Sequence, residues 1–307
     1  MQPITASIPG PAPVLTVMVL VPLAGALLLW FVPPLRGLAR GVGLVFSLGA
    51  LGVGIWAMAL FDPGSGGTVQ LAETRPWIPT LGISWALGVN ALGLAMLLLA
   101  AFLVPLVLLA GWGEIPAEHQ ALFTALVLAL EAFVVVIFSA RDVFLFYVCF
   151  EAMLVPVYVL IGRFGGPDRQ RAALKFLLYS LAGGLVMLVG VVALFFYGPR
   201  TETGYLIGSL AGSLSAPPAA ARWIFASFMI AFAIKAPLVP LHTWLPDAAE
   251  QATPGTSVLL IGVLDKIGTY GMIALVLPLF PEAAAWAAPV VLVLAVVGII
   301  YGGLAAI

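Results

Sequence analysis

Charged side chains are scarce in this chain. Asp, Glu, Lys and Arg make up 8% of its 307 residues, whereas hydrophobic residues make up 63%. Soluble domains carry about 25% charged residues, so this composition excludes a soluble globular protein. The 12 basic and 13 acidic residues leave a net charge of −1, and such a balance offers no basic surface for nucleic acid.

Cysteine is almost absent as well. Cys149 is the only one, so the chain forms no internal disulfide and has no thiolate cluster for zinc or iron–sulfur. The sequence also lacks a pair of haem ligands and a dinucleotide-binding fingerprint. We therefore expect no metal site and no cofactor in this chain.

Long apolar runs are what the sequence does contain. The mean hydropathy is +1.20, and the alternating segments of a membrane β-barrel are missing. Because lipid cannot satisfy backbone polar groups, each long run has to form its own hydrogen bonds as a helix. The sequence therefore predicts an all-α, polytopic transmembrane protein. Its expected helices, about nine, cover residues 14–32, 42–61, 86–112, 120–139, 143–162, 173–197, 223–242, 257–280 and 285–307.

The basic residues indicate how these helices are oriented. No Lys or Arg precedes the first run, so the basic region of a cleavable signal peptide is lacking. Lys and Arg favour cytoplasmic loops, which places the N-terminus outside. The loops then expected inside hold six basic residues, Arg36, Arg40, Arg163, Arg169, Arg171 and Lys175. The loops expected outside hold four, Arg75, Arg141, Arg200 and Arg222.

Two features of the connections leave the organisation open. Residues 61–86 contain "DPGSGG" and the alternating "LGISWAL", which predict either a short β-hairpin on the outer surface or an irregular loop. The last apolar run reaches Ile307 without a polar tail. We expect the natural chain to continue past this residue for several more helices.

Four charged residues lie deep inside the apolar runs, namely Glu131, Glu151, Lys235 and Lys266, and Asp265 adjoins Lys266. At a rise of 1.5 Å per residue they lie roughly 12 to 18 Å along their helices, near the middle of about 30 Å of hydrocarbon. Ionisable residues at this depth are costly and typically functional, often as proton relays. Burial weakens a lysine's hold on its proton and a nearby carboxylate strengthens it, which suits a relay. The alternative is a structural ion pair that locks helices together.

The stretch "AIKAPLVPLHTWLPD" (233–247) combines a buried lysine with three prolines. Pro237 and Pro240 should break the helix, because proline has no backbone N–H. Broken membrane helices occur where they line a polar cavity. His242 lies just beyond the break and could pass protons between the two buried lysines, or it could cap carbonyls at the interface. We expect Trp244 to anchor the chain at the membrane interface.

Three longer stretches resemble a known family. They are "FYVCFEAMLVPVYVLIGRFG" (146–165), "ALKFLLYSLAGGLVMLVG" (173–190) and "AFAIKAPLVPLHTWLPDAAEQATPGTSVLLIGVLDKIGTYGM" (231–272). Together they resemble the antiporter-like membrane subunits of respiratory complex I, NADH–quinone oxidoreductase. The segment "ATPGTSVLL" fits the subunit M type, called subunit 4 in mitochondria, better than the larger subunit L. Multi-subunit cation/proton antiporters share the same lysine-and-break design.

The resemblance implies a fold of fourteen helices with two inverted five-helix repeats. Residues 1–117 would form helices one to three with the outer loop. Residues 118–281 would form the first repeat, helices four to eight with a broken helix seven. Residues 282–307 would begin the second repeat, so the chain would be truncated relative to the family fold.

The resemblance also implies roles for particular residues. The family's glutamate on helix five matches Glu151, its lysine on broken helix seven matches Lys235, and its lysine on helix eight matches Lys266. The family's histidine after the break matches His242. One position departs from the pattern, because Asn90 stands where the family commonly has Asp.

These observations predict a proton-translocating membrane subunit of complex I in a bacterial plasma membrane. The partners implied are lipid and other membrane subunits such as the antiporter-like subunits L and N. NAD, FMN, iron–sulfur clusters and quinone would belong to partner subunits. The alternatives are a subunit of a sodium or potassium/proton antiporter, and a structural scaffold whose buried charges are replaceable.

The orientation can be tested by cysteine labelling. In a Cys149→Ser background, Asp168→Cys should resist an impermeant maleimide in intact cells and react after permeabilisation, because the loop around it is expected inside. Arg200→Cys, in a loop expected outside, is the control that should react in intact cells. Labelling of position 168 in intact cells would reverse the predicted orientation.

Overall fold

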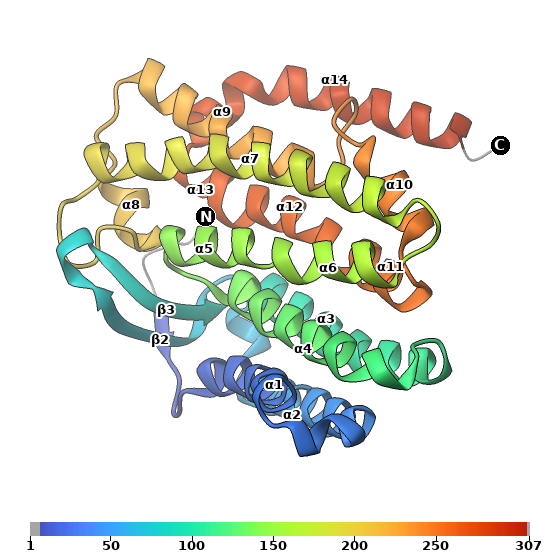
Figure 1. Cartoon of the computed structure of the whole chain (residues 1–307). Coiled ribbons are helices and arrows are strands. Elements are labelled where there is room, and N and C mark those ends of the chain that lie inside the picture. Colours follow the sequence, from blue (N-terminus) through green and yellow to red (C-terminus); the bar gives the residue numbers. More distant parts are fainter. Residues whose placement is uncertain (1–6, 306–307) are drawn as a thin grey trace.

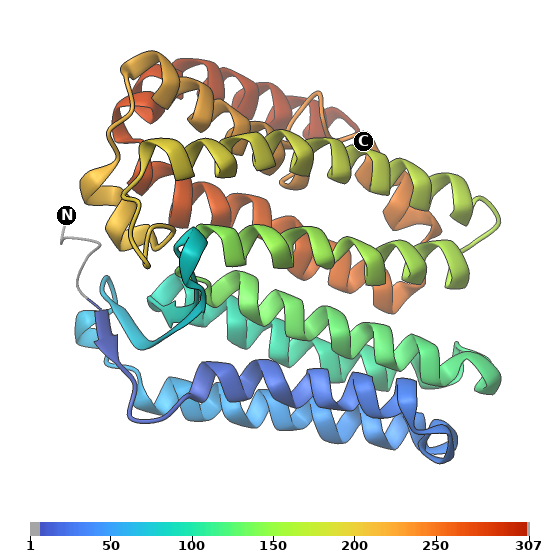
Figure 2. The ribbon, with the colours of Figure 1, turned by 60° about the vertical axis from the view of Figure 1, so that its left-hand side comes forward.

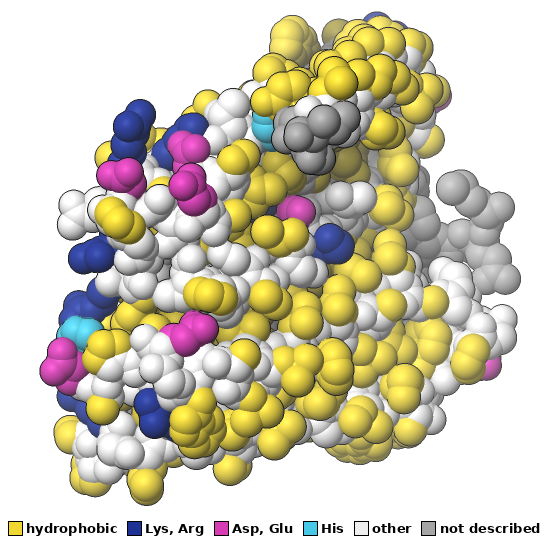
Figure 3. Space-filling model, turned by 90° about the vertical axis from the view of Figure 1, so that its right-hand side faces the viewer, with side chains coloured by type: hydrophobic (Ala, Val, Ile, Leu, Met, Phe, Trp, Pro, Cys, Tyr) yellow, Lys and Arg dark blue, Asp and Glu magenta, His cyan; other side chains and the backbone are white. Residues whose placement is uncertain are grey.

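The computed structural model describes residues 7–305 of the chain. Within that range, nine helical spans are long and apolar enough to cross a membrane, and they lie roughly side by side (Figures 1 and 2). This arrangement confirms the predicted all-α, polytopic fold. Figure 3 shows charged side chains gathered along the left edge of one face, with hydrophobic side chains over much of the remainder. A surface of this kind suits a surrounding of lipid.

The first four spans are α1 (Val14–Phe31), α2 (Ala39–Leu60), α3 (Ala91–Ala110) and α4 (Ala117–Ser139). Helix α4 is central to this group, because most of it is buried and it contacts α1, α2, α3, α5 and α6. Close packing in membranes depends on small residues at helix contacts. Gly25 of α1 is an example, since an added Cβ would lie 2.6 Å from the Phe46 ring.

The fifth span has two parts, α5 (Val143–Ala152) and α6 (Leu154–Phe164). The long helix α7 (Arg169–Tyr197) follows and packs against α5, α6 and α9. A short helix, α8 (Ile207–Ser213), leads to the seventh span, α9 (Pro218–Lys235). These elements form the upper half of the molecule together with the remaining helices (Figure 1).

The last part of the chain is less regular. Its helices are α10 (Trp244–Gln251), α11 (Pro254–Leu259), α12 (Asp265–Gly271), α13 (Leu277–Leu279) and α14 (Pro281–Ala305). The eighth span runs from α11 to α13 and contains two π-helical turns, Leu260–Leu264 and Met272–Val276. Turns of this kind are rare in proteins, and those that occur often lie at functional sites.

A small sheet accompanies the helices at one end of the bundle. Strands β2 (Val69–Ile78) and β3 (Ile83–Val89) form an antiparallel hairpin, and β1 (Ser7–Pro9) pairs with β2 in parallel. The connection that follows α2 therefore contains a hairpin and is not an irregular loop. The third span begins at Ala91 and not at residue 86, because the apolar residues before it belong to β3.

Asn90 separates the sheet from α3. Its side-chain Oδ1 accepts a hydrogen bond of 2.9 Å from the backbone N–H of Gly93, so Asn90 is the N-cap of the helix. Asn and Asp are both good N-caps, because each offers a side-chain oxygen to an otherwise unpaired N–H. The asparagine thus fills a structural role at this position that needs no charge.

Asp142 joins the sheet to the fifth span. One carboxylate oxygen accepts hydrogen bonds from the N–H groups of Phe144 (2.9 Å) and Leu145 (3.0 Å), which caps α5. The other oxygen accepts from Ser84 N–H of β3 at 2.9 Å. Burial raises the pKa of Asp142 to about 6, although these three bonds act in the opposite direction. The side chain is completely buried.

We expect Asp142→Ala to lower the free energy of unfolding by about 2 kcal/mol or more, since it removes a cap and leaves a buried N–H unpaired. Thermal unfolding of the purified protein in detergent would measure the change. Asp62→Ala is a matched control, because Asp62 caps an exposed turn through Gly64 N–H. Equal losses from both substitutions would show that the link between β3 and α5 adds nothing.

Candidate functional site

Lys235 is the last residue of α9, and it is almost wholly buried, with 1% of its surface exposed. Its Nζ has no hydrogen-bond partner among the described residues. The ammonium group instead lies 5.4 Å from the ring centroid of Phe150 in α5 and 5.0 Å from that of Phe176 in α7. These distances are typical of cation–π contacts. The lysine is therefore held between two aromatic faces and not by an acceptor.

Glu151 follows Phe150 in α5 and lies against α7. An added Cβ on Gly184 of α7 would collide with the Glu151 carboxyl group, so the absence of a side chain at position 184 makes room for the carboxylate. Atom Oε1 of Glu151 is buried and has no partner in the described part of the chain. Glu151 and Lys235 lie close enough for their charges to interact. They form no direct ion pair among residues 7–305.

The backbone after Lys235 leaves the helical path. Helix α9 ends two residues before Pro237, where the sequence had suggested an apolar run as far as residue 242. The segment continues through turns, with Leu238 N–H donating to Ala233 O at 2.9 Å, until α10 begins at Trp244. The early end has a simple cause, because proline supplies no N–H and clashes with a preceding helical turn.

Trp244 is not an interface anchor, which corrects the expectation from sequence. It is 1% exposed, its ring centroid lies 5.4 Å from that of Phe176, and its indole N–H donates to Ile234 O at 2.8 Å. The carbonyl of Ile234 lies in the last turn of α9 and would otherwise lack a helical donor. A buried indole needs such a partner, and the broken helix provides one.

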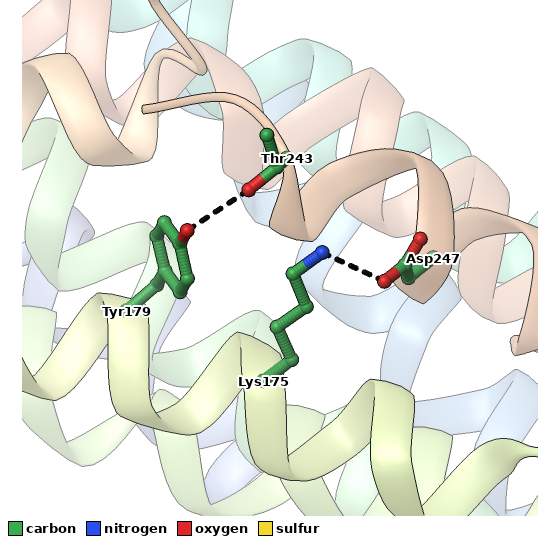
Figure 4. Close-up of polar contacts among 4 residues, drawn as sticks. All are labelled: Lys175, Tyr179, Thr243 and Asp247. Atoms are coloured by element: carbon green, nitrogen blue, oxygen red, sulfur yellow. Dashed lines mark hydrogen bonds and ion pairs between the residues drawn. The ribbon is translucent and has the colours of Figure 1, made fainter. Parts of the chain in front are cut away.

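Two polar contacts attach the segment after the break to α7 (Figure 4). Lys175 Nζ lies 2.8 Å from Asp247 Oδ2, and Tyr179 Oη lies 2.9 Å from Thr243 Oγ1. Sequence reasoning treated Lys175 only as a loop charge and missed this pair of contacts. The sequence gives no signal for these contacts, because they depend on how the chain folds back after the break.

His242 lies in the turns between α9 and α10. Its Nδ1 is buried and has no partner among the described residues. The imidazole packs edge-on against Tyr301 of α14, with 4.9 Å between the ring centroids. Among residues 7–305, no hydrogen bond joins His242 to either membrane lysine. The other histidine, His119, is more than a third exposed beside Glu118 in the first turn of α4.

Lys266 differs from Lys235 in its surroundings. It lies in α12 between the two π-helical turns, it is exposed, and its Nζ donates to Ile261 O at a long 3.4 Å. Its neighbour Asp265 is half-buried, and Oδ1 of that carboxyl group has no partner in the described chain. The structure therefore presents the Lys266 ammonium group on the surface of the bundle, away from the aromatic rings around Lys235.

Glu131 is more deeply buried than Glu151, the other carboxyl group among the four charged positions. It is 1% exposed in α4, and neither of its oxygens has a partner among the residues described. It lines a small, otherwise apolar cavity of about 10 Å³ beside Val104 of α3 and Leu259 of α11. The described residues contain no cluster of three or more His, Cys, Asp or Glu that could hold a metal ion.

A comparison with known protein families assigns the chain to one of them. Residues 140–307 match the family described as "NADH:quinone oxidoreductase/Mrp antiporter, TM". The chain belongs to this family. The resemblance seen in the motifs around Glu151, Lys235 and Lys266 is thereby confirmed.

Relatives within the NADH:quinone oxidoreductase/Mrp antiporter family cover nearly the whole chain. NADH-quinone oxidoreductase subunit M of Mycobacterium tuberculosis is 42% identical over 96% of this chain and 60% of its own length. NAD(P)H-quinone oxidoreductase chain 4 2 of Thermosynechococcus vestitus is 38% identical over 96% of this chain and 54% of its own. The chain thus spans between half and two thirds of the length of these relatives.

Solved structures agree in fold. Respiratory complex I from Thermus thermophilus with bound NADH contains a chain that is 33% identical, with a TM-score of 0.76 over 92% of this chain and 56% of that one. The Mrp complex from Dietzia sp. DQ12-45-1b contains a chain with a TM-score of 0.71 over 83% of this chain and 27% of that one. The latter is 21% identical, so it supports the shared fold alone.

We predict that Gly184→Ala displaces the Glu151 carboxyl group. The added methyl group has to push the carboxylate or α7 aside, and overpacking of this kind costs about 1–3 kcal/mol. The rate at which the buried thiol of Cys149 reacts during heating would report the loss of stability, because this thiol becomes accessible on unfolding. A high-resolution map of the variant would show the displacement directly.

Gly298→Ala is the matched control for this experiment. An added Cβ there would have Val239 Cγ2 as its nearest neighbour at 3.8 Å, which is an ordinary contact. Both substitutions gain the same intrinsic helix propensity, about 1 kcal/mol, so the difference between them isolates the collision with Glu151. Equal stabilities and an unmoved carboxyl group would contradict the prediction.

Proposed function

We propose that this chain is a proton-translocating membrane subunit of NADH–quinone oxidoreductase, complex I. The observation that carries the proposal is the environment of Lys235, an ammonium group buried without an acceptor, between two aromatic rings and within electrostatic reach of Glu151. A lysine in such a place can change its protonation when a nearby charge moves. Similarity to subunit M and chain 4 relatives supports the same assignment.

The proposed roles follow from the positions of the side chains. Lys235 holds and releases the proton, and Glu151 sets the local charge that favours its protonated form. The broken backbone at Pro237 and Pro240 provides polar groups that a continuous helix would have used internally. His242 receives the proton beyond the break.

The remaining charged positions extend the proposed path. Lys266 passes protons onward along the eighth span, where the π-helical turns interrupt regular hydrogen bonding. Glu131 serves as a further proton-holding group, enclosed between α3, α4 and α11. Within the described residues, neither side chain forms a hydrogen bond or ion pair with Lys235, so the path requires intervening groups that carry protons across the gaps.

The redox chemistry in this proposal belongs to partner subunits. NAD, FMN, iron–sulfur clusters and quinone would be bound there, and their energy would reach this chain as a shift of the Glu151–Lys235 pair. The partners would include antiporter-like subunits of the L and N types. The chain would lie in a bacterial plasma membrane with its N-terminus outside, as its basic loop residues favour.

The family also contains Mrp-type antiporter subunits, so the alternative function is exchange of sodium or potassium for protons. The two functions differ in what drives transport. Proton movement in membrane vesicles that requires NADH and is insensitive to an imposed sodium or potassium gradient would favour complex I. Transport driven by the imposed gradient without NADH would favour the antiporter.

The proposal predicts that Lys235→Ala in the assembled complex lowers NADH-driven proton pumping by about ten-fold or more, since a positioned proton-transfer group typically contributes at least that much. Glu151→Gln should also impair pumping, because it removes the anion beside the lysine. Lys235→Arg should fail as well, because arginine keeps its proton. Reduction of the partner subunits' redox centres by NADH should be unaffected.

Arg163→Ala is the control, because it removes an exposed cation from α6 without touching the buried site. The amount of assembled complex has to be measured in each variant, so that a loss of assembly is not read as a loss of pumping. Near-normal pumping in fully assembled Lys235→Ala complex would refute the relay. It would leave a replaceable structural charge as the better description.

A further inference from the structure

A second polar site lies at the end of the bundle that carries the sheet. A cavity of about 350 Å³ opens between the hairpin and the segment that leads into α8. Its volume falls in the roughly 300–1,000 Å³ range of small-molecule sites. Its lining includes Ala72, Thr74, Arg141 and Ser209.

Among the described residues, Arg141 is the only charged one that lines this cavity. Its backbone is fixed on both sides, because its N–H donates to Ala86 O at 2.8 Å and its carbonyl accepts from Ile207 N–H at 2.9 Å. Its aliphatic stem packs on Gly88, where an added Cβ would lie 3.2 Å from Arg141 Cγ. The backbone and stem therefore position the guanidinium group at the cavity.

The Arg141 side chain is half-buried, and its charge is uncompensated. Burial lowers the pKa of Arg141 from its usual value. Its side chain forms no hydrogen bond or ion pair with other described residues. The adjacent carboxylate of Asp142 is already occupied by three backbone N–H groups. The nearby hydroxyl of Tyr270 already donates to Phe138 O at 2.7 Å.

We propose that this cavity binds a phosphate-type oxyanion, with Arg141 as the charge that holds it. A guanidinium group offers five N–H donors in a planar fork that matches the oxygens of a phosphate. The hydroxyl groups of Thr74 and Ser209 line the same cavity as neutral donors. An apolar ligand would leave the arginine unpaired, and a cation would be repelled by it, so neither fits.

Two sources could supply this oxyanion, an anionic phospholipid headgroup and free phosphate. The inference rests on the cavity alone and is independent of the proposed proton translocation. The full chain, reconstituted in nanodiscs of phosphatidylcholine, would be titrated with inorganic phosphate in one arm. In the other arm, phosphatidylglycerol would replace part of the phosphatidylcholine. Bound ligand stabilises the folded protein, and the thiol reactivity of buried Cys149 during heating would report this stabilisation.

We expect Arg141→Gln to lower the affinity for the stabilising ligand by about ten-fold or more, because a charge-assisted contact is lost. Arg75→Gln is the matched control on the exposed part of β2, and it should leave binding unchanged. A response to phosphate alone identifies a free anion, and a response to phosphatidylglycerol alone identifies a lipid headgroup. Either response supports the site if it depends on Arg141.

Ala72→Leu provides a second variant if Arg141→Gln does not fold, because it places a larger side chain in the cavity and should weaken binding in the same way. The proposal is wrong if wild type responds to neither ligand, or if its response survives the substitutions that do fold. It is also wrong if Arg75→Gln has the same effect as Arg141→Gln, because the anion would then be attracted by the protein's basic side chains in general. Loss of complex assembly without ligand binding would point to a neighbouring protein's carboxylate instead.

Discussion

The need to hold an ammonium group away from water organises the centre of this molecule. Lys235 has no acceptor among the described residues and is instead faced by the rings of Phe150 and Phe176. Aromatic faces stabilise a cation less strongly than a carboxylate in direct contact would. The charge is therefore only partly compensated, and it remains sensitive to Glu151 close by. A tighter ion pair would fix the proton, whereas a fully apolar shell would expel it.

Helix α7 makes this arrangement possible. It contributes Phe176 beneath the ammonium group and Gly184 beside the Glu151 carboxyl group. On the same helix, Lys175 and Tyr179 attach the segment that follows the break. A single helix thus contacts the lysine, its carboxylate and the α10 region. A displacement of α7 would change all three contacts together, which is a suitable property for coupling a distant event to a buried charge.

Polar groups at the sheet end of the bundle are hydrogen-bonded, whereas several in its interior are not. At the sheet end, Asp142 and Asn90 each satisfy backbone N–H groups at helix starts, and the hairpin pairs its own backbone. In the interior, the carboxylates of Glu131 and Glu151 and the imidazole of His242 keep unpaired atoms. Unpaired buried groups are expensive, so their accumulation inside a well-bonded frame points to use and not to stability.

Hydropathy by itself determined the number and approximate limits of the membrane spans, because a chain in lipid must satisfy its backbone within each helix. It also marked Glu131, Glu151, Lys235 and Lys266, since charges stand out in apolar runs. The family motifs indicated which of these positions correspond to charged positions of the family, namely Glu151, Lys235 and Lys266. Proline chemistry indicated that the helix would stop close to Lys235, and only the exact residue came from the structure.

Tertiary structure decided which of these charges are enclosed. The spans are apolar on all sides, so their sequence does not show which face meets a neighbour. Lys235 and Lys266 look alike in sequence, yet one is enclosed by aromatic rings and the other is exposed. The inward position of Trp244 and the pairing of Lys175 with Asp247 were equally unreadable. Both depend on how the chain folds back after the break, and that path is set by contacts between residues distant in sequence.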